Sequence, residues 1–406
     1  MKSCQKNVWF HERPLCIIAI GLLLGVLMIR IIATEQAVLA AALLLMVALS
    51  AAIFHKRRFL LLFCCMALGL LNAAFHLPAD GTIPKSGPVV TVSQPRVSAG
   101  FCTVRDLVGE RIRLLFPENG AVAKGMLLGE KDDIDAATME QFGRVGVLHL
   151  LAVSGLHVSV LAGALALLFR RNPWVRFAAV AIFCAGYAAL TAFSASVLRA
   201  SLMLLYWYLA FPLRRRPDGP SALAFSFIVI VGVNPLTLFR TGFQLSFLAV
   251  YGLMLLEPLF ARPLARFGST AAGLIAGSCA VVVATAPAMA LHFRELSFMS
   301  LLTNLFVLPM APFFLVPAFL ATVVSFLSLP IAEIIAIPGR FALNLIVAVS
   351  NAGGDWTMRV RTPDAFAYLL FLTAIVLYSR LFLRDGAQRA LYGTVTLAAA
   401  LLLWLL

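Results

Sequence analysis

The chain has 406 residues, of which 62% are hydrophobic and 12% are charged, and its formal net charge is +14. Soluble domains contain roughly 45–50% apolar and about 25% charged residues, so this composition excludes an ordinary water-soluble protein. Apolar runs of about 20 residues, long enough to cross a hydrocarbon core of about 30 Å as helices, recur along the chain. The predicted fold class is an all-α polytopic membrane protein with about 11–13 transmembrane helices, some of them broken or re-entrant.

Three apolar runs open the chain, at residues 15–33, 36–54 and 59–76. They predict an N-terminal three-helix membrane segment over residues 1–76. An odd number of crossings puts the following long loop, residues 77–146, on the face opposite to the N-terminus.

The basic residues gather in alternate short loops between the apolar runs. The clusters are Lys2/Lys6/Arg13, Lys56/Arg57/Arg58, Arg170/Arg171/Arg176, Arg214/Arg215/Arg216, Arg262/Arg266 and Arg380/Arg384/Arg389. Short cytoplasmic loops carry an excess of Lys and Arg, so the pattern predicts a multi-pass membrane protein of the inner-membrane kind with its N-terminus in the cytoplasm. The external loop, residues 77–146, has 8 Lys and Arg against 9 Asp and Glu, so its charge does not point to nucleic acid.

The external loop combines two patterns. Residues 89–93, 102–107 and 111–116 alternate like short strands and are separated by Pro and Gly, which predicts a small β fragment. Farther along, apolar residues recur at helical spacing and predict amphipathic helices, the last of them starting at Asp132 and Asp133. Such helices either lie at the lipid surface or pack on a neighbouring domain, and both alternatives stay open.

From Val147 the chain returns to the membrane. Spans are predicted at residues 147–169, 174–193, 195–211, 220–233, 241–256, 269–292, 331–350, 364–383 and 390–406. The stretch 298–329 contains Pro309, Pro312 and Pro317, which interrupt helical hydrogen bonding. It is therefore either a kinked span or two half-helices that re-enter.

The 7 cysteines and 6 histidines form no metal-ligand pattern. No Cys-x-x-Cys pair occurs, no two histidines stand two residues apart, and Cys102 has no partner in the external loop. The sequence therefore predicts no disulfide framework, no metal site and no cofactor.

Polar side chains inside hydrocarbon are costly and usually face a bundle interior or a water-filled path, so they are the first candidates for function. The densest group is His149, Ser154, Gly155 and His157 at the start of a span. On one helix the two histidines would lie about 80° apart and face one interior stripe. Arg199 stands out because an Arg near mid-span costs at least about 2.5 kcal/mol on insertion scales.

Three further polar groups lie in the spans: Ser196 to Ser201 around Arg199, Gln244 with Ser246, and Thr303 with Asn304. For a single Ser or Asn, an ordinary interhelical hydrogen bond of about 0.6–2 kcal/mol is the competing interpretation.

At these residues the chain resembles the bacterial competence-protein family of DNA-uptake channels (ComEC type). Five motifs stand in the family's order over about residues 121–310. They are Leu127-Leu-Gly-Glu-Lys-Asp, Gly146-Val-Leu-His149-Leu-Leu-Ala-Val-Ser154-Gly155-Leu-His157-Val, Val197-Leu-Arg199-Ala-Ser-Leu-Met, Asn234-Pro235 with Gly242-Phe-Gln-Leu-Ser-Phe-Leu-Ala249, and Pro287 with Phe293 and Asn304-Leu-Phe-Val-Leu-Pro309.

The resemblance implies a competence-type membrane channel domain over residues 147–406 that passes one DNA strand inward. It implies single-stranded DNA and membrane lipid as partners, together with separate DNA-receptor, nuclease and cytoplasmic motor proteins. Carried over residue by residue, the candidates for the translocation path are His149, Ser154, Gly155, His157, Arg199, Gln244, Ser246 and Asn304.

The chain also departs from the family's full-length pattern. The external loop is too short for a complete oligonucleotide-binding barrel beside its helices, and no His-x-His-x-Asp-His cluster of the family's nuclease domain occurs. The chain is therefore expected not to be an enzyme. A glycine expected before Phe193 is replaced by Ala192.

Three other functions remain as alternatives. Broken helices near Pro309, together with Arg199, suit a secondary transporter of a small anion. A degenerate family member without transport activity would keep the same motifs. An intramembrane serine hydrolase would use Ser154 as nucleophile and His157 or His149 as its base.

Overall fold

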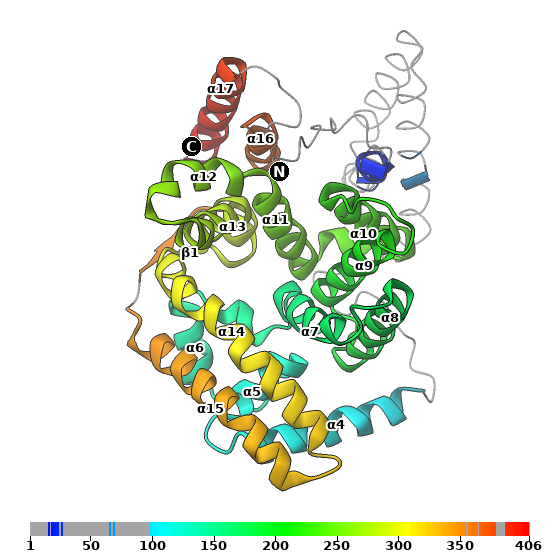
Figure 1. Cartoon of the computed structure of the whole chain (residues 1–406). Coiled ribbons are helices and arrows are strands. Elements are labelled where there is room, and N and C mark those ends of the chain that lie inside the picture. The colour runs from blue at the N-terminus through cyan, green and yellow to red at the C-terminus, as the bar shows by residue number, and fades with distance from the viewer. Residues whose placement is uncertain are drawn as a thin grey trace.

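The structure confirms the all-α membrane fold (Figure 1). It is a computed structural model that describes residues 97–405 apart from 355, 364 and 379–385, and short pieces before them at 15–26, without 17, 24 and 25, and at 65, 68 and 69. The predicted span at 36–54, the predicted strand 89–93 and most of the predicted spans at 15–33 and 59–76 lie outside the described residues.

The described part of the chain is a succession of helices joined by short turns. The first half contains α4 Val97–Leu115, α5 Gly120–Leu128, α6 Ala136–Arg144, the 3-10 helix η2 Leu148–Leu151, α7 Gly155–Leu168, α8 Pro173–Leu190, α9 Ala195–Ala210 and α10 Gly219–Val233. The second half contains η3 Pro235–Phe239, α11 Thr241–Leu255, α12 Glu257–Leu264, η4 Ala265–Phe267, α13 Ser269–Phe293, α14 Met299–Val324, α15 Leu329–Ala352, α16 Ala365–Tyr378 and α17 Gly386–Leu405. Strands β1 Glu295–Ser297 and β2 Thr357–Arg359 pair antiparallel, with Leu296 opposite Met358.

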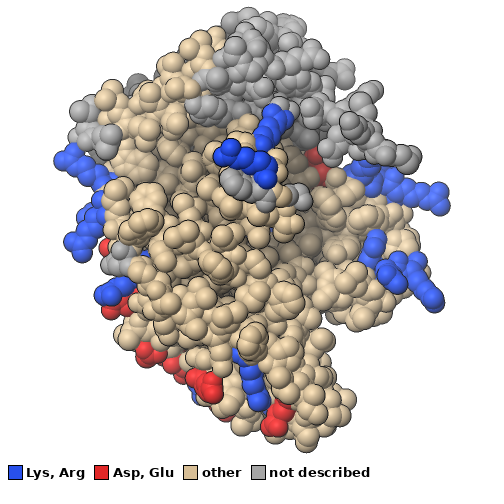
Figure 2. Space-filling view, turned by 60° about the vertical axis from the view of Figure 1, so that its left-hand side comes forward, with Lys and Arg blue, Asp and Glu red and all other residues tan. Residues whose placement is uncertain are grey.

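Membrane crossing is supported by the length and the surface of these helices. Among the described residues, α8, α13, α14 and α15 are long and apolar enough to cross a membrane, and the α11–α12 pair, bent by 47°, makes a fifth if it is one span. Their outward side chains include Ile182, Phe313 and Phe341, which are 75%, 63% and 72% exposed. Figure 2 shows a broad uncharged surface with most charged side chains toward its margins. Such a surface suits lipid as the surrounding solvent.

Side-chain caps and prolines set the helix starts. Asn172, the residue before Pro173, is the N-cap of α8, and its side chain accepts a hydrogen bond from the backbone N–H of Trp174. The side chain of Asp218 accepts from the backbone N–H of Ser221 at the start of α10. Helix α6 starts three residues beyond the predicted Asp132–Asp133 position, because Asp135 is its N-cap and accepts from Thr138 N at 2.9 Å.

The predicted strands 102–107 and 111–116 are wrong, because both lie in or at the end of helix α4. Ile112 and Leu115 of this helix are buried in the core at 1% and 0% exposure, at a helical spacing. Gly109, which reads as a break in the sequence, sits inside the helix, where a Cβ would lie 2.8 Å from Cε of Lys124. The glycine lets α5 approach α4 closely.

Helix α5 belongs to the protein core. It buries Val122, Ala123, Gly125, Met126, Leu127 and Leu128. These side chains share one core with α7, α8, α14 and α15, so for α5 the structure favours packing on neighbouring helices over lying at the lipid surface. The predicted boundary between an external region and a membrane domain at residues 146/147 stays a prediction.

Helix α14 is continuous, so the alternative of two half-helices is wrong. It runs side by side with α15, and the two lie against α4–α6 (Figure 1). Gly339 of α15 lies against α14, because a Cβ there would be 3.5 Å from the carbonyl oxygen of Phe314, and this packing supports a helix that contains prolines.

Candidate functional site

The candidate site lies where the N-terminus of α7 meets α9 and α11. The predicted span 147–169 does not begin as one helix: residues 148–151 form η2, Ala152 is extended, and α7 starts only at Gly155. His149 and His157 are therefore on different helices, and the predicted common helical stripe is wrong.

Ser154 and His157 close the first turn of α7. The backbone N–H of Ser154 donates to Nδ1 of His157 at 2.9 Å, and Oγ of Ser154 lies 2.7 Å from the same nitrogen. Because a backbone N–H is only a donor, Nδ1 is an acceptor and the neutral imidazole carries its proton on Nε2. His157 is fully buried, and its Nε2 has no hydrogen-bond partner. This is the geometry of a capping box at a helix N-terminus.

His149 takes a different position. It is exposed, and its Nδ1 lies 3.2 Å from the carbonyl oxygen of Gly146, to which it donates. Gly146 has φ +75, and a Cβ there would lie 2.5 Å from Cβ of Ser300. The motif glycine thus lets the start of α14 approach the turn that carries His149.

Arg199 is the buried cation of the site. It is 5% exposed, and its Nε donates to Oγ of Ser246 on α11 at 2.8 Å. Oγ of Ser246 in turn donates to Oγ of Ser196 at 3.1 Å. The guanidinium carbon lies 6.0 Å from the ring centre of Phe247. Two serines and one aromatic ring from α9 and α11 therefore surround the guanidinium.

Gly155 makes room for this guanidinium. A Cβ at Gly155 would lie 2.5 Å from Nη2 of Arg199 and 3.5 Å from Cβ of Ala200. The glycine of the Ser154–Gly155 pair therefore lets the guanidinium touch the first turn of α7, a role that follows from the absence of a side chain. Two motifs that are 44 positions apart in the sequence meet at this contact.

Among the residues that the structure describes, no carboxylate pairs with Arg199. Every ion pair found among the described residues lies elsewhere, and neither Glu257 nor Glu333 pairs with it. The first-turn N–H groups of α7 add partial positive charge at the same place. A buried guanidinium with free donors beside a helix N-terminus is an arrangement that suits an anion.

Two candidates lie away from this contact. Gln244 donates through Nε2 to the carbonyl of Leu238 at 3.1 Å, and its Oε1 lies 2.9 Å from Nε2 of His292 on α13. It stands two residues before Ser246 and so on another face of α11. Asn304 on α14 is 8% exposed, and its Oδ1 is buried without a hydrogen-bond partner.

Sequence reasoning missed two features near the site. Met203, whose Sδ lies 3.9 Å from Nη1 of Arg199, follows it by four residues, and that helical spacing was the available signal. His292, a histidine at the end of an apolar run, is tied to Gln244. The turn before α9 is also unusual, because Ala192 and Phe193 have φ of +53 and +51, and the family's glycine is expected at Ala192.

The first family motif, which begins at Leu127, forms the turn that follows α5 and packs against Val153, two residues before α7. Gly129 ends α5 with φ +77, and a Cβ there would lie 3.4 Å from Cγ2 of Val153, next to Ser154. Glu130 then pairs with Arg105 and with Lys124, each at 2.5 Å. Burial lowers the pKa of Lys131 in the same turn. This turn holds α5 on α4 and positions the segment that leads into α7.

Three curated relatives resemble the chain over part of their length. ComE operon protein 3 of Bacillus subtilis (strain 168) is 30% identical over 214 residues, which cover 52% of this chain and 27% of that protein. An uncharacterized protein of Aquifex aeolicus (strain VF5) is 28% identical over 286 residues, 68% of this chain and 65% of that protein. Uncharacterized protein YcaI of Escherichia coli (strain K12) is 27% identical over 229 residues, 53% of this chain and 30% of that protein. The chain thus spans less than two thirds of each relative's length, and no solved structure matches it.

The family model named Competence protein matches residues 126–385, which contain the whole Gly155–Arg199–Ser246 contact. This match extends over well more than half of the chain, and the chain is therefore a member of the competence protein family.

Proposed function

We propose that this chain is an inner-membrane channel that passes single-stranded DNA into the cytoplasm during DNA uptake, with its N-terminus in the cytoplasm. The observation that carries the proposal is Arg199, a buried guanidinium that touches the N-terminus of α7 and has no carboxylate partner among the described residues. Membership of the competence protein family supports the same role.

The free donors of Arg199 give it a chemical task in such a path. Nε donates to Ser246, Nη1 lies 3.9 Å from the sulfur of Met203, and Nη2 lies against Gly155. A guanidinium has five N–H donors in a planar fork, a geometry that matches the oxygens of a phosphate. As a DNA strand passes this point, each phosphate would lose hydrating water and accept hydrogen bonds from these donors and from the backbone amides of α7 instead.

The proposal places the remaining machinery on other chains. A DNA receptor, a nuclease that removes the second strand and a cytoplasmic motor would supply capture, strand separation and driving force. The chain itself would transport and not catalyse. The contact between Ser154 and His157 fits this division, because it closes a helix turn and His157 has no acceptor on Nε2 to orient it as a catalytic base.

The test is uptake of labelled DNA in cells whose own gene is deleted and replaced by variants of Arg199. Arg199→Gln should lower uptake roughly 10- to 100-fold, because charge-assisted hydrogen bonds of about 1.5–3 kcal/mol are lost. The level of the protein in the membrane should stay near wild type, because the change removes a desolvated charge. Arg199→Lys should lie between the two, since it keeps the charge and loses the planar fork.

Arg176→Gln is the matched control. Arg176 is a cation on the neighbouring helix α8, held over the rings of Tyr208 and Phe211. The Arg176→Gln substitution should leave uptake of labelled DNA unchanged. Normal uptake at a normal protein level in Arg199→Gln would refute the phosphate role.

The same cation also suits a transporter of a small anion, which is the second candidate function. Purified protein in vesicles separates the two: a channel for DNA should admit a labelled oligonucleotide and show no saturable uptake of phosphate or sulfate. A chain with neither activity in vesicles or cells would be a degenerate member of the family.

A further inference from the structure

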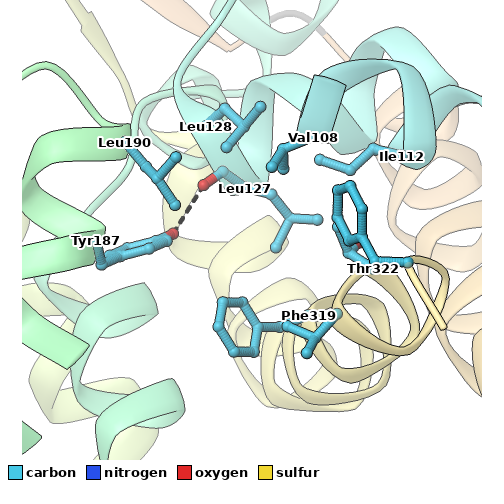
Figure 3. Close-up of a pocket in the computed structure, with 10 residues that line it drawn as sticks. Val108, Ile112, Leu127, Leu128, Tyr187, Leu190, Phe319 and Thr322 are labelled. Atoms are coloured by element: carbon cyan, nitrogen blue, oxygen red, sulfur yellow. Dashed lines mark hydrogen bonds between the residues drawn. The ribbon is translucent and has the colours of Figure 1, made fainter. Parts of the chain in front are cut away.

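A cavity of about 170 Å³ lies between α4, α5, α8 and α14, away from Arg199 (Figure 3). Val108 of α4, Leu127 and Leu128 of α5, and Phe319 of α14 point toward it. The two hydroxyl groups in its wall are already used. Tyr187 donates to the carbonyl of Leu127 at 2.8 Å, and Thr322 donates to the carbonyl of Ala318 at 2.7 Å.

The lining of the cavity is therefore apolar, and both of its hydroxyl groups already donate hydrogen bonds within the protein. A water needs about two to four polar partners, and an apolar cavity of about 150 Å³ stays dry in a protein and takes up an apolar guest. The occupant that this lining suits is a hydrocarbon chain.

One end of the lining reaches the outer surface of α14. Val323 and Phe326 line the cavity and are 49% and 50% exposed. The guanidinium carbon of Arg111 lies 5.5 Å from the ring centre of Phe326. Among the described residues no carboxylate pairs with Arg111, whereas the neighbouring Arg105 on the same helix is paired with Glu130. An uncompensated cation thus stands at the mouth of an apolar cavity on a membrane helix.

We propose that this cavity binds one acyl chain of an anionic phospholipid, whose phosphate meets Arg111. Apolar lining, an opening on an exposed membrane helix and an unpaired Arg at the opening are the three features that such a lipid requires together. The lipid would fill the space between α4–α5 and α8–α14 and hold these helices together. The proposal does not depend on the transport of DNA.

The experiment measures phospholipid retained by the full chain, extracted from the membrane in a mild detergent, by native mass spectrometry. Val108→Trp places an indole in the cavity and should reduce retained phospholipid at least about tenfold, since each methylene displaced weakens binding about fourfold. Val104→Trp is the matched control one helical turn earlier, where the side chain is 48% exposed and does not line the cavity. It should retain lipid as the wild type does.

Val323→Trp blocks the mouth without entering the core and should give the same loss, which keeps the test valid if Val108→Trp does not fold. Retention that is equal in Val323→Trp and wild type overturns the proposal. The proposal is also overturned if the species bound to the wild type is exchanged for detergent.

The headgroup is tested with vesicles of phosphatidylglycerol and of phosphatidylcholine added to delipidated protein. Phosphatidylglycerol should raise the melting temperature of the wild type more than phosphatidylcholine does, and Arg111→Gln should abolish that difference. Arg171→Gln, which changes an exposed Arg in the α7–α8 turn, should keep it. An equal response of the wild type to both lipids overturns the assignment of Arg111.

Discussion

Charged residues are arranged differently in the α4–α6 region and in the contact between α7, α9 and α11. In the first, Arg105, Arg113 and Lys124 meet Glu130 and Asp133 in one connected set of ion pairs. In the second, Arg199 is more deeply buried and meets the hydroxyl of Ser246, the sulfur of Met203, the ring of Phe247 and Gly155, with no carboxylate partner among the described residues. The first arrangement compensates its charges within the protein, whereas a buried charge without a carboxylate partner is a candidate functional site.

Backbone strain follows the same division. The α4–α6 region and the turn after it use glycine where φ is positive, at Gly129 and Gly146. The turn that leads into α9 puts Ala192 and Phe193 at positive φ instead. Among the described residues, Arg214 after α9 and Arg294 after α13 also have positive φ, at +53 and +58, so the strained turns flank α9 but are not confined to it.

The largest effect should come from Gly155→Ala. The new methyl group would collide with Nη2 of Arg199, which is the flexible end of a side chain, so the guanidinium should move and its bond to Ser246 should break. Uptake of labelled DNA should fall roughly 10- to 100-fold, as for Arg199→Gln, with little change in protein level. Gly163→Ala, on the same helix with nothing within 4 Å of the new Cβ, is the control and should behave as wild type.

The double variant Gly155→Ala/Arg199→Gln sharpens this prediction. If both substitutions act on one contact, the double variant should transport no worse than either single variant. If the loss of uptake in the double variant equals the product of the two single losses, Gly155 acts independently of Arg199.

Glu130→Gln should give the second largest effect, and on stability. Glu130 is 13% exposed in its side chain and holds both Arg105 and Lys124. Removing the charge should lower the free energy of unfolding by about 1–3 kcal/mol, between the values for exposed and buried pairs. Melting temperature and protein level should fall, but uptake per molecule should not. A fall in uptake per molecule would break the contrast between the two regions. Glu110→Gln, at a pair that is 67% exposed on the acid, should change neither.

The sequence predicted the membrane helices better than it predicted their ends. Apolar runs define α8, α9, α11 and α13 because hydrocarbon selects for them directly. The glycines in α4 and the prolines in α14 predict breaks that the structure does not have. Packing of α4 against Lys124 and of α14 against α15 overrides the local propensity. The break before α7 leaves no mark in hydropathy, although Ser154 is a typical N-cap residue and indicates it.

The sequence names the candidate residues but not the contacts between them. The cost of a buried Arg singles out Arg199 from the sequence alone. Its partner does not follow from the sequence, because Gln244 and Ser246 lie two residues apart and only the packing of α11 on α9 decides that Ser246 meets the guanidinium. Whether the candidate residues line a translocation path stays a prediction.

A smaller and opposite effect should come from Ala192→Gly. An L-residue at positive φ costs about 1–2 kcal/mol, which glycine avoids, and the greater freedom of glycine in the unfolded chain offsets part of this. We expect a gain of about 0.5–1 kcal/mol, seen as a higher melting temperature. Ala178→Gly, at an exposed position inside α8, should lower stability by a similar amount. A lower melting temperature for Ala192→Gly would mean that the turn carries no strain to relieve.

The smallest effect should be an acid dependence of the α4–α6 region. Hydrogen bonds from Arg113 and Lys124 hold the pKa of Asp133 below its ordinary value of 3.8. Because the folded value lies below the unfolded one, this carboxylate contributes stability that is present above about pH 4 and is lost as the pH falls through the folded pKa. The Asp133 side chain is 36% exposed, so solvent and salt screen the pairs and the contribution is small.

Melting temperatures measured from about pH 6 down to about pH 3 should therefore fall less steeply for Asp133→Asn than for wild type, and about 1 M salt should reduce the difference. Gly155→Ala should keep the acid dependence of the wild type, because the contact around Arg199 contains no carboxylate to titrate. Acid dependence that changed with Gly155→Ala would show that an acid faces Arg199 after all, and the two regions would then be built on the same principle.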